Sequence, residues 1–148
     1  MPAGSIPALI LIFLGGVAIA VQAPINAALG RSVGSGLAAA AVSFGVGFAV
    51  LIVVSLATSG AAPFEKASGV PWWQLAGGLL GAFYVWSVIA GLSGLGVLTA
   101  LVALILGQLG AALVLDHLGA FGLPAQPVSL RRVVAVTLVA AGLLLSRG

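Results

Sequence analysis

The sequence predicts an all-α membrane protein with five transmembrane helices in one domain, residues 1–148. The first indication is composition: hydrophobic residues make up 62% of the chain and charged residues 5%. A soluble domain carries about 45–50% apolar and about 25% charged residues. The second indication is spacing, because the apolar residues gather in segments close to the roughly 20 residues that a helix needs to cross the hydrocarbon layer.

Turn-forming residues separate the five apolar segments. The glycine-rich stretch 30–36 ends the first segment, and Pro71 closes the loop after the second. Gly94 and Gly96 mark a tight turn between the third and the fourth, which predicts an antiparallel hairpin. A loop rich in glycine and proline precedes the fifth, which is near the lower length limit for a span. The predicted helices cover residues 6–29, 37–58, 72–92, 95–115 and 130–146.

The charged residues all fall at predicted helix ends or in loops, as expected where a charge at mid-membrane costs at least about 2.5 kcal/mol. Trp72 and Trp73 begin the third helix, where an interfacial aromatic anchor belongs. The first segment is too long for a signal peptide and has no cation before it, so we expect it to be retained. The charged and titratable residues are Arg31, Glu65, Lys66, Asp116, His117, Arg131, Arg132 and Arg147.

Composition also excludes several classes of function. Five Lys and Arg with two Asp and Glu cannot cover a soluble enzyme or a nucleic-acid-binding domain with polar surface. The chain has one His and no Cys, and it lacks metalloprotease, P-loop and serine-hydrolase motifs. We therefore expect no enzymatic activity, no cofactor, no metal and no nucleic-acid partner.

The cations are divided almost evenly between the two sides of the membrane. Five spans would place Lys66, Arg131 and Arg132 on one side, and Arg31 and Arg147 on the other. The positive-inside rule needs a clearer asymmetry than three against two. One reading is a single, weakly specified orientation with a cytoplasmic N-terminus. We favour dual topology, in which two copies, or one copy and a paralogue, form an antiparallel dimer of ten helices around a cavity.

Small residues predict where helices pack, because association in lipid depends on close approach. Helical spacing aligns Gly96 and Gly107 with alanines on one stripe of the fourth helix, and Gly77 and Gly81 share a face of the third. We interpret these glycines as packing seams, with sliding or hinge contacts as the alternative.

Neutral polar residues within the spans are the candidate substrate contacts, since a polar group in hydrocarbon needs a hydrogen-bond partner. Gln22 and Asn26 share a face of the first helix, with Pro24 between them opening the backbone. Each polar residue is open to a second reading as a hydrogen bond between helices. The candidates are Gln22, Asn26, Ser43, Tyr84, Ser87 and Gln108.

Asp116 and His117 end the fourth helix. An acid beside a histidine could relay protons and couple transport to a proton gradient. Adjacent side chains do not face each other on a helix, however, so a structural role at the interface is the second interpretation.

Three stretches resemble a known family: Gln22–Gly30 (QAPINAALG), Pro71–Val85 (PWWQLAGGLLGAFYV) and Gly107–Gly119 (GQLGAALVLDHLG). Together they resemble the short bacterial inner-membrane proteins of domain-of-unknown-function family 606, the YdcZ-like group of the drug/metabolite transporter superfamily. The resemblance implies a five-helix subunit that pairs antiparallel, with functional positions at Gln22, Asn26, Tyr84, Gln108 and Asp116. The central glutamate of the superfamily's smallest multidrug exporters is missing.

These observations predict a small transporter in the bacterial inner membrane, working by alternating access on a small neutral or zwitterionic metabolite. Two alternatives remain. A passive channel could use the same neutral lining. A non-transporting membrane subunit would use the polar residues only to join helices.

Overall fold

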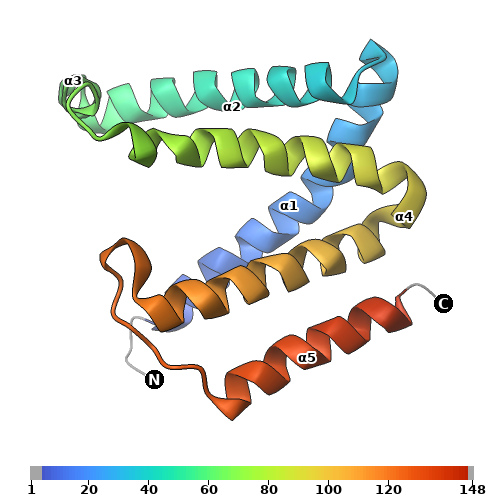
Figure 1. Ribbon diagram of the computed structural model, residues 1–148. Helices are drawn as coiled ribbons and strands as arrows, with labels where there is room; N and C mark the ends of the chain where they lie inside the picture. The colour runs from blue at the N-terminus through green and yellow to red at the C-terminus, as the bar shows by residue number, and fades with distance from the viewer. Residues whose placement is uncertain (1–4, 147–148) are drawn as a thin grey trace. The chain divides into compact units, whose positions relative to one another are not determined.

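The computed structural model describes residues 5–146, and every regular element in that range is helical, which confirms the all-α prediction. Arg147 lies outside the described residues. Three helices, α1, α2 and α4, are long and apolar enough to cross a membrane. Figure 1 shows α1 (Ser5–Val33), α2 (Gly36–Ser59), α3 (Ala62–Ala67), α4 (Trp72–Leu118) and α5 (Leu130–Leu145), with a short 3-10 turn at Ala120–Gly122.

The α4 helix contains the third and fourth predicted spans. It runs without a loop from Trp72 to Leu118 and breaks at Gly96, where φ is 72° and ψ is 167°. This backbone conformation is essentially restricted to glycine. The predicted turn therefore consists of one residue, and each arm of α4 exceeds the roughly 20 residues that a span needs. The predicted loop residues just before Gly96 are helical.

Two other boundaries differ from the prediction. The glycine-rich stretch after residue 29 does not end α1, which continues to Val33 before a two-residue turn. The turn is closed by the Ser35 hydroxyl, which accepts a hydrogen bond from the amide of Ala38 at 3.2 Å and caps α2. The loop expected after α2 contains the short helix α3, and Pro63 lies in the first turn of this helix.

The α5 helix matches the expected position but is short. Its 16 residues extend about 24 Å at 1.5 Å per residue, against roughly 30 Å of hydrocarbon. The Ser129 hydroxyl caps it by accepting from the amide of Arg132. Its role as a fifth span stays a prediction.

The chain divides into two compact units, and the boundary along the sequence lies between Ser93 and Gly94. In the first unit, α1, α2 and the first arm of α4 pack around a small core of Ala39, Ala40, Val85 and Ile89. Alanines and glycines form much of this contact, as expected for helices that associate in lipid. Large apolar side chains on the same helices point outward, where a membrane protein meets lipid or another subunit.

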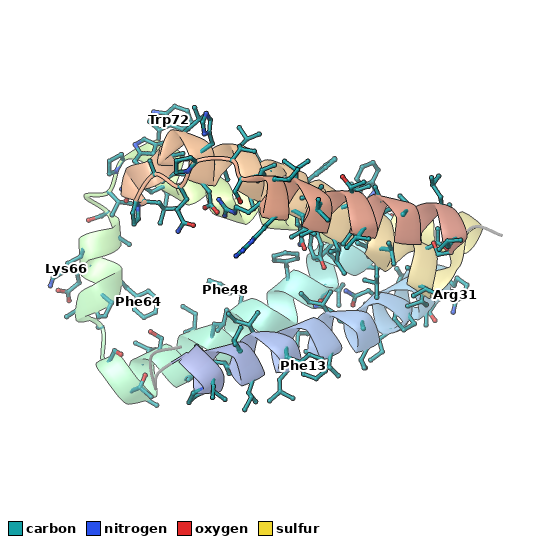
Figure 2. The ribbon with its side chains drawn as sticks, turned by 90° about the horizontal axis from the view of Figure 1, so that it is seen from below. Phe13, Arg31, Phe48, Phe64, Lys66 and Trp72 are labelled. Atoms are coloured by element: carbon teal, nitrogen blue, oxygen red, sulfur yellow. The ribbon has the colours of Figure 1, made fainter. Side chains whose placement is uncertain are left out.

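The two ends of the first unit carry its charged groups. Figure 2 shows Arg31 at the end of α1 and Lys66 on α3, at opposite ends of this unit. Trp72 lies at the Lys66 end and is 81% exposed. A charge at each end and an exposed aromatic ring at one of them agree with the expected interfacial positions.

In the second unit, a hydrogen bond joins the second arm of α4 to α5. The hydroxyl of Thr99, which is buried, donates to the carbonyl of Ser146 at 2.9 Å. The sequence reading passed over Thr99, although the rule that singled out Ser43, a hydroxyl inside an apolar span, applies to it equally.

Candidate functional site

A small cavity with three polar residues in its lining lies between α1 and the first arm of α4. Gln22 and Asn26 line it from α1, and Tyr84 lines it from α4. Apolar side chains, Ile19, Val85, Val88 and Ile89 among them, complete its wall. We call this cavity the inner pocket. Three of the six residues predicted to contact substrate therefore meet at one place.

Asn26 is the most unusual residue of the inner pocket. Only 5% of it is exposed, and none of the side-chain hydrogen bonds formed within residues 5–146 involves it. No fully buried side-chain nitrogen or oxygen within residues 5–146 lacks a partner, so the Asn26 amide keeps accessible surface toward the inner pocket. The inner pocket has a volume of about 10 Å³, room for about one water molecule. Its contents are therefore the available partner for the Asn26 amide.

Gln22 also lines a second space, a groove between α1 and α2 with a volume of about 290 Å³. Ser43 lines this groove from α2, together with Phe44, Gly47 and Phe48. Gln22 is exposed and Ser43 is half-buried. Gln22 thus lines both spaces. Four of the six predicted substrate residues, Gln22 included, line one space or the other.

The other two predicted substrate residues lie differently. The Ser87 hydroxyl donates to the carbonyl of Tyr84 in its own helix at 2.8 Å, so it is engaged locally. Gln108 is exposed on the second arm of α4, in the second unit. Its predicted substrate contact stays a prediction.

A much larger cavity opens where α1 turns into α2. It has a volume of about 500 Å³, and we call it the outer cavity. Arg31, Ser35 and Ser93 supply its polar lining, and Trp86 supplies an aromatic ring. Trp86 is 41% exposed, and its ring lies 6.0 Å from that of Phe83, measured between centroids.

Asp116 is held at the end of α4. Its carboxylate pairs with the guanidinium of Arg132, and its carbonyl accepts from the amide of Gln126 at 2.7 Å. Arg132 also donates to the carbonyl of Gln126 at 3.4 Å. These contacts tie the loop before α5 to both helices, as in the structural reading of Asp116. His117 is exposed, and its coupling role stays a prediction.

The glycines predicted as packing seams differ from one another. A β-carbon on Gly81 would lie 3.5 Å from the ring of Phe44, so this glycine does face a neighbouring helix. A β-carbon on Gly77 or Gly107 would meet no atom of the described chain within 4 Å. Gly96 breaks the helix instead. Among the glycines within helices, the tightest contacts are at Gly36 and Gly30, which the sequence reading did not select as a pair.

Long apolar helices with a small pocket between them define a multi-helix membrane protein. The chain belongs to the family described as "Putative inner membrane exporter, YdcZ", whose pattern matches residues 7–145. This confirms the resemblance and places the protein in the inner membrane.

Among curated proteins, the chain is 36% identical over 80 residues to Inner membrane protein YdcZ of Escherichia coli (strain K12). The match covers 53% of this chain and 54% of that relative, so it spans about half of each. No solved structure matches the chain.

Proposed function

We propose that this protein is a small inner-membrane transporter that moves a neutral or zwitterionic metabolite by alternating access. The observation that carries the proposal is the inner pocket, where Gln22, Asn26 and Tyr84 converge from two helices. Two amides and a phenol can donate and accept hydrogen bonds without carrying charge. Membership of a family described as an exporter supports the general role.

The absence of charge in the inner pocket favours a neutral cargo. None of its lining residues is an acid or a base, and Asp116 is engaged with Arg132 in the other unit. An ion entering such a pocket would lose its hydration without meeting a counter-charge. An uncharged polar solute would exchange water for the amides and the phenol, which costs much less. The same lining offers no nucleophile beside a base, so we also propose that the protein is not an enzyme.

We further propose that two copies, or one copy and a paralogue, assemble antiparallel. Arg31 and Lys66 lie at opposite ends of the first unit, so each face of the membrane receives part of a small positive charge. This balance gives little basis for choosing one orientation. Opposed copies would provide the two-fold symmetry that transporters with inverted repeats use to alternate between states.

Proteoliposomes containing the purified protein test the transport proposal against a panel of labelled neutral and zwitterionic metabolites. We expect saturable uptake of at least one compound, and we expect Asn26→Leu to abolish it. Gln74→Leu is the matched control, because Gln74 is an exposed amide on α4 that lies outside the inner pocket. Steady flux without saturation would instead support a channel. Absence of flux for the whole panel would support a non-transporting subunit.

The orientation proposal has its own test. The natural chain has no cysteine, so each introduced one is unique. Ser32→Cys and Lys66→Cys report the two ends of the first unit. With dual topology, a membrane-impermeant thiol reagent applied to one side of intact cells labels a fraction of each variant. Labelling of one variant alone would show a single orientation and refute the proposal.

A further inference from the structure

Ile89 lies between the inner pocket and the outer cavity. It is the one residue of the described chain that lines both spaces. On one side lies a cavity of about 500 Å³ with Arg31 in its lining, and on the other side lies a water-sized pocket with Asn26. Ile89 therefore lies between a large, partly polar space and the small pocket that Asn26 lines.

Two glycines hold Ile89 in this position. A β-carbon on Gly36 would lie 3.1 Å from the Cγ2 atom of Ile89, and one on Gly30 would lie 3.4 Å from the same atom. Ile89 is only 8% exposed and belongs to the core with Ala39 and Val85. Glycine at both positions creates the notch at the α1–α2 turn into which the branched side chain fits.

The environment of Ile89 is asymmetric. Gly30 and Gly36, which face its Cγ2 side, also line the outer cavity, so this side of Ile89 borders the larger empty volume and the other side borders the inner pocket. An isoleucine side chain occupies discrete rotamers, so it can change position in a single step. The space that such a step requires is already present in the outer cavity.

We propose that Ile89 is the apolar barrier of the solute pathway, and that water-soluble molecules reach Asn26 from the outer cavity only when Ile89 moves. An apolar constriction excludes water and hydrated ions because neither can exchange its hydration for contacts there. A small uncharged solute faces the lowest cost of passing. The proposed barrier rests on the position of Ile89 in the lining of both cavities, and its importance for a solute rests on the transporter function proposed above.

The chemical accessibility of position 26 tests the barrier. Asn26→Cys places a unique thiol in the inner pocket, and the protein is then reconstituted in nanodiscs, where both membrane faces meet solvent. The probe is (2-sulfonatoethyl) methanethiosulfonate, a small water-soluble thiol reagent. We expect slow labelling with Ile89 present, and a rate at least about tenfold higher when Ile89→Ala is added.

Val85→Ala is the matched control, because Val85 is an equally buried aliphatic residue of α4 that lines the inner pocket but not the outer cavity. It should leave the labelling rate within about twofold of the parent, since it opens no path to solvent. Ser93→Cys, in the lining of the outer cavity, should label quickly in every background. Equal acceleration by Ile89→Ala and Val85→Ala would overturn the proposal, because general loosening of the core would then explain both.

Should Ile89→Ala fail to fold, Ile89→Val removes one methyl group and provides the milder test. Its labelling rate should rise about two- to threefold, and an unchanged rate would refute the barrier. The labelling measurement does not depend on transport. Labelling that responds to Ile89 together with no flux in liposomes would refute the transporter while the barrier stands. Flux together with labelling that ignores Ile89 would refute the barrier while the transporter stands.

Discussion

Replacing Asn26 by leucine should make the protein more stable and less functional. Asn26 is 5% exposed as a residue, and no hydrogen bond within the described chain involves its side chain. Its amide keeps contact only with the water-sized inner pocket, so it is poorly solvated, and a poorly solvated amide costs about 1 kcal/mol or more relative to an apolar group. Leucine branches at the same carbon atom, and its extra volume can enter the adjoining inner pocket. We expect Asn26→Leu to raise the free energy of unfolding by about 1–2 kcal/mol.

The sign of this change separates the two roles open to Asn26. If the amide joined helices within an assembled dimer, its removal would lower stability by about 0.6–2 kcal/mol. If the amide binds a solute and has no protein partner in the free state, its removal raises stability and abolishes uptake. Stability can be followed by the helical circular dichroism signal during heating in detergent, where about 1 kcal/mol corresponds to roughly 2–4 °C for a chain of this size.

Two further variants serve as controls for this interpretation. Asn26→Ala cannot clash with its neighbours, so it distinguishes an unfavourable amide from an overfilled pocket. It should change the melting temperature little, because the cavity that it leaves offsets the relief of the amide. Gln74→Leu places the same apolar side chain at an exposed position and should stay within about 0.5 kcal/mol of the parent. A clear loss of stability in both Asn26 variants would refute the reasoning.

Three more predictions concern residues of the second unit. Thr99→Val should cost about 1 kcal/mol in a thermal melt, because a buried hydrogen bond is lost, whereas Thr137→Val, where the hydroxyl bonds only its own helix, should be nearly neutral. Asp116→Asn and Arg132→Gln should each expose the loop before α5 to limited proteolysis, and the double variant should be no more sensitive than either single one. Additive sensitivity would show that the two side chains act separately. Gly107→Leu should leave the melt of the subunit unchanged and reduce cross-linking between copies, since the described chain has no atom near that glycine.

Much of the fold could be predicted from the sequence because the bilayer leaves few alternatives. Apolar length and the position of charges were sufficient for α1, α2, both arms of α4 and the placement of α5. The errors are at connections. Gly30 resembles a helix terminator, yet α1 continues to Val33 because the Ser35 cap lies further along the chain. The short α3 helix has no apolar periodicity that could have revealed it.

The candidate site was predictable in part for a related reason. Asn26 and Tyr84 are polar residues in apolar helices, so sequence alone marks them, and helical spacing joins Gln22 to Asn26. That Tyr84 meets them depends on how α1 packs against α4, which no local pattern encodes. Ile89 could not be distinguished from any other apolar residue. Its importance comes from two glycines on other segments of the chain.

The break at Gly96 also matters for the length of α4. An unbroken helix of 47 residues would be a rod about 70 Å long, more than twice the thickness of the hydrocarbon layer. The non-helical residue at position 96 divides that length into two arms, each long enough for one passage. A residue with a β-carbon would be strained at this positive φ, so the division of the longest helix depends on glycine at this one position.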